Sequence, residues 1–121
     1  MLILVRGLPG SGKSTYAKSL NIMHIEADMY HMKDGVYMYD SKKQKAAHEW
    51  CCRTTKSFLL RGIDVVVSNT FTQKWELEPY ISMAKETQTP YQIVTMKNQY
   101  GNIHNVPQEV IEKMTSRWEE L

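Results

Sequence analysis

The sequence contains few features that would place the chain outside a cell or in a membrane. Its only cysteines are the neighbours Cys51 and Cys52, which lack the spacing of a zinc site or a CxxC redox pair. Two cysteines cannot form a disulfide framework, so we expect a reducing compartment. The apolar start, residues 1–5, is too short for a signal peptide or a membrane span. These absences predict a cytosolic protein without a membrane segment.

The sequence also lacks a large excess of positive or negative side chains. Fifteen basic and thirteen acidic side chains leave a formal net charge of +2. Bulk attraction to nucleic acid is therefore not expected, and any polyanion must be bound by a local cluster. The chain has 121 residues without a repeat, a low-complexity tract or a linker. We therefore predict a single domain over residues 1–121.

Apolar runs and helical periodicities alternate along the chain. Short apolar runs predict buried parallel strands at residues 2–5, 24–27, 64–68 and 91–96. Apolar residues at helical spacing predict helices from the glycine loop, over residues 41–61, over 74–87 and from Pro107 onward. Pro79 is unfavourable in mid-helix, so the third helix either starts near Glu78 or bends there. Residues 28–40 are expected to be irregular, with a turn at Asp34-Gly35.

This alternation predicts the fold class. Right-handed crossovers give an α/β, three-layer P-loop NTPase fold, with a four-stranded parallel sheet and helices on both faces. Ligands of such sheets bind at the carboxyl ends of the strands. The expected site therefore comprises the glycine loop, Ala27-Asp28, the segment 68–70 and the residues after Met96.

The glycine loop matches the Walker A pattern in full, as Gly7-Leu8-Pro9-Gly10-Ser11-Gly12-Lys13-Ser14. Glycines let successive amide N–H groups point at phosphate oxygens. Lys13 is expected to reach the β- and γ-phosphates of ATP, and the Ser14 hydroxyl to bind Mg²⁺. The residues expected to bind the nucleotide are Gly7, Gly10, Ser11, Gly12, Lys13, Ser14 and Thr15.

A carboxylate directly follows the second predicted strand. A kinase needs an acceptor for the proton of the attacking hydroxyl near the γ-phosphate, and Asp28 can supply it. From position alone Asp28 is equally well a helix cap or a turn residue. Glu26 is the competing carboxylate, but strand alternation turns it to the opposite face from Ala27.

The later motifs make the chain similar to a known family. After the loop come Ile25-Glu26-Ala27-Asp28-x-Tyr30, Ala47-His48-Glu49-Trp50, Val66-Val67-Ser68-Asn69-Thr70, Trp75-Glu76-x-x-Pro79-Tyr80 and Asn102-Ile103-His104-Asn105-Val106-Pro107. Together they resemble the P-loop 5′-polynucleotide kinase family. That family includes the phage-type enzymes and short phage and eukaryotic relatives classed as AAA-family ATPases. The resemblance covers nearly the whole chain.

The resemblance implies an ATP-dependent kinase that transfers the γ-phosphate to a 5′-hydroxyl of RNA or DNA. Lys13 matches the family's phosphate lysine, Ser14 its magnesium hydroxyl and Asp28 its general base. Asn69 and Thr70 match the substrate-side element after the third strand. Val106 and Pro107 match the start of the last helix near the substrate mouth. The nucleic acid 5′ end is thus the implied partner.

Two departures from the family concern arginines. Phage-type enzymes carry an arginine three residues beyond the base, where this chain has His31. They also carry a lid arginine before the Asn-x-His-x-Val-Pro element, where this chain has Gln99-Tyr100-Gly101. Without it we expect slow chemistry, an arginine from a partner, or a compensating group such as Arg6, Lys97 or His104.

Several other side chains have two interpretations. His31 either binds phosphate or bonds Asn69, or it is a solvated loop histidine. Tyr30 and its neighbouring loop aromatics either stack on bases or cover the edge of the core. His48 is expected to be a packed or capping residue. The substrate set is therefore Tyr30, His31, Asn69, Thr70 and Val106.

Two functions compete with the polynucleotide kinase. The lack of a strong basic stripe favours a kinase for a nucleoside or another small hydroxyl compound. The missing lid arginine favours a nucleotide-binding module with little or no turnover.

Overall fold

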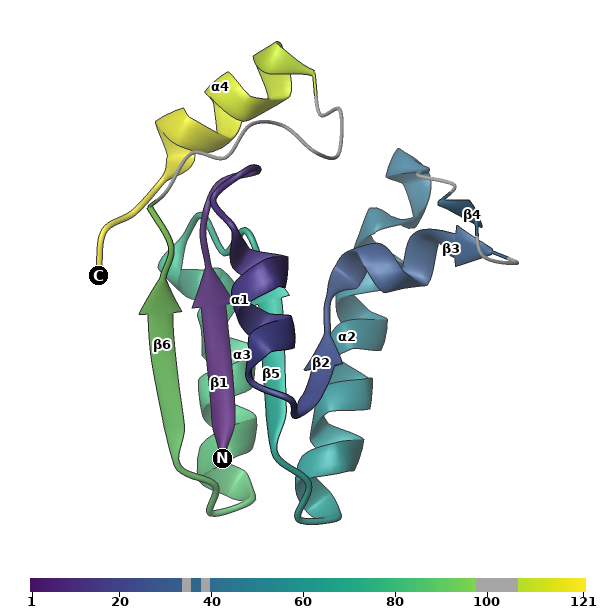
Figure 1. Cartoon of the computed structure of the whole chain (residues 1–121), viewed down its shortest axis with the longest axis vertical. Coiled ribbons are helices and arrows are strands. Elements are labelled where there is room, and N and C mark those ends of the chain that lie inside the picture. Colours follow the sequence, from purple (N-terminus) through teal and green to yellow (C-terminus); the bar gives the residue numbers. More distant parts are fainter. Residues whose placement is uncertain (34–35, 38–39, 98–106) are drawn as a thin grey trace.

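Four parallel strands form the central sheet of the computed structural model, which describes residues 1–33, 36–37, 40–97 and 107–121. The strand order is β2-β5-β1-β6 (Figure 1). Their bounds are Leu2–Arg6 for β1, Met23–Ile25 for β2, Val65–Asn69 for β5 and Tyr91–Thr95 for β6. The central strands β1 and β5 are almost entirely buried, which explains their continuous apolar sequences. The predicted four-stranded parallel sheet is confirmed.

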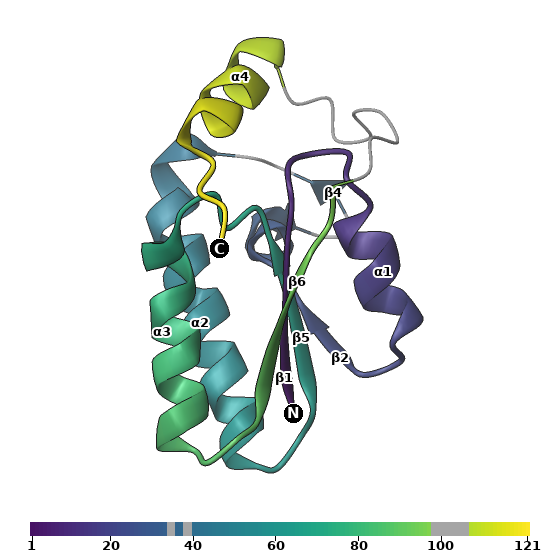
Figure 2. The ribbon, with the colours of Figure 1, turned by 90° about the vertical axis from the view of Figure 1, so that its left-hand side faces the viewer.

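Helices cover both faces of this sheet. Helix α1, Lys13–Ser19, lies on one face, and helices α2, Gln44–Leu60, and α3, Lys74–Glu86, lie on the other (Figure 2). The larger core cluster, between the sheet and the helix pair, includes Leu4, Val67 and Leu77. The smaller cluster, under α1, is built on Val5, Ala17 and Val66. Two core layers on one sheet make the predicted three-layer fold.

The segment predicted to be irregular contains short regular elements. Strand β2 ends at Ile25, and Ala27 already belongs to a 3₁₀ helix, η1, over Ala27–His31. An antiparallel pair follows, with β3 at Met32–Lys33 and β4 at Val36–Tyr37. A second 3₁₀ turn, η2 at Ser41–Lys43, leads into α2. Such short elements leave almost no periodic signal, which explains why the sequence did not reveal them. The turn expected at Asp34-Gly35 lies outside the described residues.

Helix α3 begins before its proline. Its first residue is Lys74, so Pro79 lies inside the helix rather than at its start. The Glu76 carboxylate accepts hydrogen bonds from the Gln73 backbone N–H, at 2.8 Å, and from the Thr72 hydroxyl, at 2.9 Å. These contacts fix the first turn, and Pro79 removes only the one backbone bond that its own N–H would have made.

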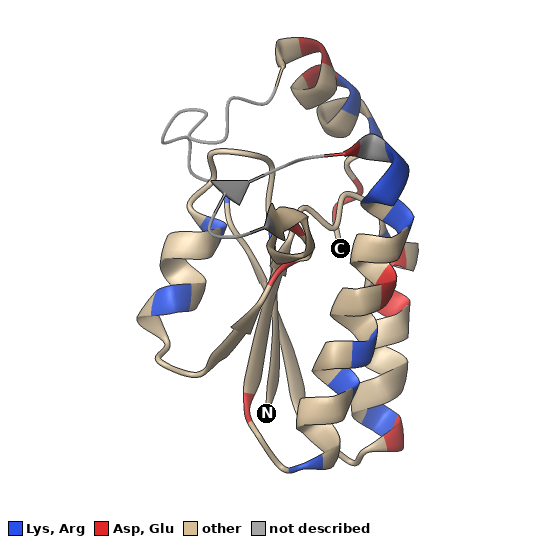
Figure 3. Ribbon diagram, turned by 90° about the vertical axis from the view of Figure 1, so that its right-hand side faces the viewer, with Lys and Arg blue, Asp and Glu red and all other residues tan. Residues whose placement is uncertain are grey.

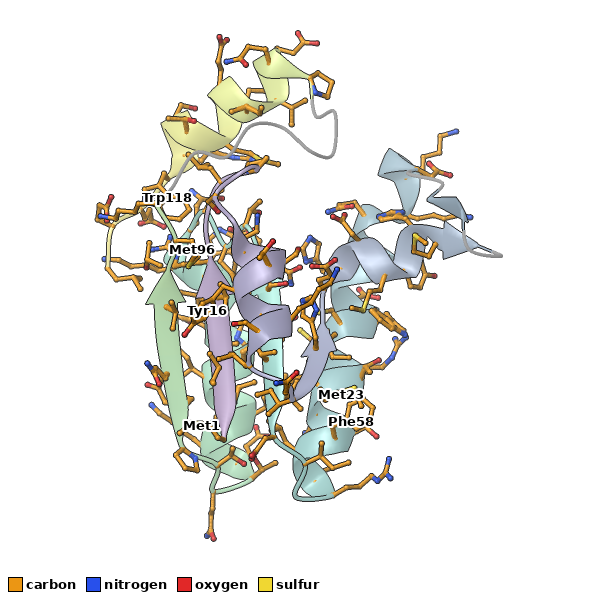
Figure 4. The ribbon with its side chains drawn as sticks, viewed as in Figure 1. Met1, Tyr16, Met23, Phe58, Met96 and Trp118 are labelled. Atoms are coloured by element: carbon orange, nitrogen blue, oxygen red, sulfur yellow. The ribbon has the colours of Figure 1, made fainter. Side chains whose placement is uncertain are left out.

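Helix α4, Gln108–Arg117, does not cover a face of the sheet. It lies above the carboxyl ends of the strands and has no buried residue (Figure 1). The segment after it is anchored instead. The Glu119 N–H donates to the Thr72 carbonyl at 2.7 Å, and the Trp118 ring lies 4.0 Å from the Arg6 guanidinium carbon. Figure 4 shows Trp118 near the top of the sheet, close to Met96.

Arg6 is the centre of this anchor. Its side chain is fully buried at the end of β1. The guanidinium donates to the carbonyl oxygens of Phe71, at 2.7 Å, of Thr72, at 3.3 Å, and of Glu119, at 2.8 Å. Arg6 therefore joins the first strand to the loop after β5 and to the C-terminal segment. These bonds use Nε and Nη2, while Nη1 is buried without a hydrogen-bond partner among the described residues. The idea that Arg6 compensates for the missing lid arginine stays a prediction.

Replacing Arg6 with alanine is expected to lower the free energy of unfolding by about 2–3 kcal/mol, because charge-assisted bonds to three carbonyl groups are lost. Urea titration followed by circular dichroism measures the change. Arg61→Ala is the matched control, since Arg61 is exposed just after α2 and its guanidinium carbon lies 5.8 Å from the centre of the Phe58 ring. Equal stabilities for the Arg6 and Arg61 variants would refute the anchor.

Candidate phosphate-binding and phosphoryl-transfer site

The glycine loop connects β1 to α1, as the Walker A pattern predicts. Gly10 and Gly12 have φ angles of 83° and 91°, which side chains rarely adopt. Gly7 is fixed by space instead, because a Cβ there would collide with the Ser11 hydroxyl and approach the Met96 carbonyl oxygen to 2.8 Å. The Gly7 N–H donates to the Thr70 carbonyl at 3.2 Å, which joins the loop to the segment after β5.

The loop contains polar groups that suit a phosphate. The Ser11 hydroxyl is buried and has no hydrogen-bond partner among the described residues. The Lys13 ammonium lies 3.4 Å from the Leu8 carbonyl oxygen, folded across the loop. Burial lowers the pKa of Lys13, and the charges of Glu26 and Asp28 act against that shift. A partly buried cation and an unsatisfied buried hydroxyl on the same loop are suitable for binding an anionic phosphate.

Glu26 lies in this site, contrary to the expectation that it turns away. The Ser14 hydroxyl donates to its carboxylate at 2.8 Å, and the Ser68 hydroxyl donates to the same oxygen at 2.9 Å. His24 Nε2 lies 2.6 Å from the Ser68 oxygen. The Ser68 hydroxyl proton already points to Glu26, so the Ser68 oxygen acts as the acceptor and His24 Nε2–H donates to it. Its side chain reaches the face of the sheet that α1 covers, because Ser14 belongs to that helix.

Hydrogen bonding sets the ionisation of Glu26. Burial raises the pKa of this carboxyl group, but bonds from His24, Ser14 and Ser68 outweigh burial and lower the pKa to about 2. Glu26 is therefore a fixed negative charge beside the hydroxyl expected to bind Mg²⁺.

Glu26→Gln is expected to lower the free energy of unfolding by about 1–2 kcal/mol at pH 7, because the charged acceptor is lost. The folded-state pKa is depressed. Its stabilisation is therefore fully present above the unfolded value of 4.5 and is lost as the pH falls toward about 2. Urea titrations at pH 7, 4 and 3 on both proteins measure the difference. A difference that does not shrink in acid would contradict the assignment.

Asp28 lies in the first turn of η1. It is partly buried, and its charge favours the protonated forms of both Lys13 and His48. The carboxylate is therefore near the phosphate lysine and near α2. Figure 3 shows acidic residues at the point where β2 leads into η1, facing the start of α1. A carboxylate in that position can accept a proton from a hydroxyl brought to the loop.

Asn69 and Thr70 connect the parts of the site. The Asn69 side-chain oxygen accepts from the Ala27 N–H at 2.9 Å, and its amide group donates to the Cys51 sulfur at 3.6 Å. Asn69 thereby holds the start of η1 against α2. The Thr70 carbonyl oxygen accepts a hydrogen bond from the Gly7 N–H. Their predicted contact with substrate stays a prediction.

A polar chain that the sequence did not reveal runs beside Asp28. His31 is buried and is not a solvated loop histidine. Its Nε2 lies 3.0 Å from the Gln44 side-chain oxygen, and Gln44 Nε2 lies 3.0 Å from His48 Nε2. Burial lowers the pKa of His48. Gln44 and His48 are four residues apart on α2, which was the one available signal for their contact.

The remaining predicted residues are exposed or lie outside the described part of the chain. Tyr30 is 39% exposed and packs against Trp50, with ring centroids 6.1 Å apart, so one ring face is supported and part of it is open. Thr15 is exposed on α1. Lys97 is also exposed, and its ammonium lies 3.5 Å from the Glu120 carboxylate. Val106 and His104 fall outside the described residues.

The fold and this loop define a P-loop nucleotide-binding protein of the kinase-like α/β class. The AAA domain family matches residues 2–99, and the chain belongs to that family. Within the part of the chain that the structure describes, no helix is both long and apolar enough to cross a membrane.

Similar proteins give the context. The chain is 31% identical over 134 residues to NEDD4-binding protein 2 from Homo sapiens, an alignment that covers 98% of this chain and 8% of that protein. A chain of the Pnkp1/Rnl/Hen1 RNA repair complex is similar with a TM-score of 0.72 and 16% identity, covering 96% of this chain and 43% of that one. Chaetomium thermophilum Kti12 in complex with ADP-AlF3 is similar with a TM-score of 0.65 and 18% identity, covering 99% and 81%. At such identities the two structures show the fold alone.

Proposed function

We propose that this chain is an ATP-dependent kinase that transfers the γ-phosphate of ATP to a 5′-hydroxyl of RNA or DNA. One observation supports the proposal above all: Lys13 in the first turn of α1 and Asp28 in the first turn of η1 both follow strands of the parallel sheet, at its carboxyl edge, and the Asp28 charge acts on Lys13. A phosphate-binding cation and a carboxylate that accepts the proton would then act at the same edge of the sheet. The similarity to a chain of an RNA repair complex and to a protein bound to ADP-AlF3 supports both halves of the proposal.

The residues of the loop suit the roles that transfer requires. The backbone amides and Lys13 hold the phosphates, and Ser14 would hold Mg²⁺, which when bound offsets phosphate charge. Asp28 accepts the proton of the 5′-hydroxyl as its oxygen attacks the γ-phosphorus. The bond between that phosphorus and the bridging oxygen breaks, and ADP leaves. Tyr30, which packs against Trp50, would stack on the terminal base.

An acceptor panel tests the proposal. The protein is incubated with γ-labelled ATP and 5′-hydroxyl RNA, 5′-hydroxyl DNA, or free nucleosides. The matched control oligonucleotides already carry a 5′-phosphate. Label on the 5′-hydroxyl oligonucleotides and none on the controls is expected. Label on nucleosides alone would replace this proposal with a small-molecule kinase.

A nucleotide-binding module with little turnover is the second candidate. The hydrogen bonds of Arg6 to backbone carbonyl groups and its contact with Trp118 favour it, because they use much of this guanidinium in the fold. Tight ATP binding without labelled product from any acceptor would support this candidate. Product formed only after addition of a partner protein would indicate that the missing arginine comes from that partner.

A further inference from the structure

The strand beside β1 lacks the carboxylate that a P-loop site normally requires. In P-loop NTPases the loop Ser or Thr shares the magnesium ion with an acidic side chain from a second segment. Here β5, which pairs with β1 along its whole length, ends in Ser68 and Asn69. Neither residue carries a charge, so the acid must come from elsewhere if the loop binds a magnesium nucleotide.

We propose that Glu26, from the end of β2, is the carboxylate that holds the nucleotide's Mg²⁺ together with Ser14. The proposal rests on the proposed function in one respect, which is that the loop binds ATP. Glu26 reaches over Ser68 to the Ser14 hydroxyl, and the same oxygen accepts from both residues. The Glu26 carboxylate therefore lies beside the end of β5, where a carboxylate on that strand would otherwise be expected.

The direction of the Ser14 hydrogen bond supports this role. A hydroxyl has one proton and two lone pairs, and Ser14 directs its proton at Glu26. The lone pairs of Ser14 are then free to bind a cation. Glu26 is itself held, because the His24 ring donates to Ser68 and Ser68 donates to Glu26. Orientation of a metal-binding group by a hydrogen-bonded carboxylate is a general feature of metal sites.

The small number of protein ligands also fits magnesium. Among the described residues, no group of three His, Cys, Asp or Glu side chains could hold a metal ion. Magnesium does not need such a cage, since it is usually held by one or two carboxylates and by substrate phosphates. The Ser14 hydroxyl and the Glu26 carboxylate, beside the phosphate loop, are therefore enough protein ligands for a nucleotide-bound Mg²⁺.

Glu26 and Asp28 therefore have different tasks. Glu26 contacts Ser14 at the start of α1, on the metal side of the loop. Asp28 lies in the first turn of η1, the element that packs against α2. The two carboxylates are separated by Ala27, whose N–H is fixed by Asn69.

The test measures the magnesium dependence of nucleotide binding, without any need for turnover. Affinity for a fluorescent ATP analogue is determined with Mg²⁺ and with EDTA. Glu26→Gln is expected to lower the affinity measured with Mg²⁺ by about 10- to 100-fold and to leave the affinity measured in EDTA almost unchanged, so that most of the gain from Mg²⁺ is lost. Glu78→Gln, on the exposed surface of α3, is the matched control and should keep the full gain.

A double variant tests the position of the charge. Ser68 Oγ lies 2.9 Å from the Glu26 carboxylate, so a carboxylate at position 68 can reach the same place. Glu26→Ser combined with Ser68→Asp is expected to recover most of the magnesium gain that Glu26→Ser alone loses. Recovery would show that a negative charge is required there, whichever strand supplies it, and it would remove misfolding as an explanation.

Three outcomes would overturn the inference. The first is a Glu26→Gln protein that keeps the full magnesium gain. The second is an equal loss of affinity with Mg²⁺ and with EDTA, which would assign Glu26 a structural role. The third is a wild-type protein that binds no nucleotide, which would refute the proposed function as well. Only the first two leave nucleotide binding intact in the wild type, so the two failures are distinguishable.

Discussion

Replacing Lys13 with methionine is expected to lower ATP-dependent phosphoryl transfer by about 100- to 1,000-fold or more, because a preorganised cation beside the phosphates is removed. Methionine keeps most of the volume of the side chain. Folding should be preserved, since burial already disfavours the charged form of Lys13. The measurement is the rate of label transfer from ATP to a 5′-hydroxyl oligonucleotide, alongside thermal unfolding of both proteins.

Lys18→Met is the matched control for this experiment. Lys18 belongs to the same helix, α1, but it is exposed in the last turn. Loss of one surface charge there should change the rate by less than about threefold. If the Lys13 and Lys18 variants transferred phosphate equally well, the loop would not be the site of transfer, and the proposed function would fail with it.

The fold was predictable from the sequence because its central strands are buried on both sides. The apolar runs at residues 2–5 and 65–67 are continuous, as in strands buried on both faces, and the first of them leads through Arg6 into the glycine loop. The Walker A spacing placed the loop correctly, since its glycines are needed for positive φ angles and for close packing. Local sequence carried this information without any knowledge of distant contacts.

The role of Glu26 could not be predicted in the same way. Alternation along a strand tells which face a side chain takes, but it does not tell which helix covers that face. The contact with Ser14 depends on where α1 packs, twelve residues earlier in the chain. The same limit applies to Arg6, whose partners Phe71 and Glu119 are 65 and 113 residues away.

The last helix illustrates a third limit. Its apolar periodicity predicted a helix correctly, and Pro107 does precede it as the N-cap residue. Periodicity does not say what a helix packs on. The structure places α4 above the strand ends, where the bonds of Arg6 and Thr72 to the following segment fix its C-terminal side. A sheet-covering helix would have buried its apolar stripe, and α4 has no buried residue.

Replacing Asp28 with asparagine is expected to separate nucleotide binding from transfer. Asparagine has the size and hydrogen-bonding reach of aspartate but cannot take up a proton, so transfer should fall by about 100- to 10,000-fold. Affinity for ATP should stay the same or increase. The reason is electrostatic, because the Asp28 charge lies near Lys13 and would repel the negative triphosphate. Both quantities are measured on the same preparation, with label transfer for the rate and a fluorescent ATP analogue for the affinity.

The matched control is Asp64→Asn, just before β5, where the exposed carboxylate lies 2.9 Å from the N-terminal ammonium. That variant should transfer phosphate at the wild-type rate. Glu26→Gln provides a second comparison. That variant should lose the increase in ATP affinity that Mg²⁺ causes, whereas Asp28→Asn should keep it. An Asp28→Asn protein that transfers phosphate normally would remove Asp28 as the base. One that no longer binds ATP would instead assign Asp28 to the nucleotide pocket, and the proton acceptor would then have to be sought along the His31–Gln44–His48 chain.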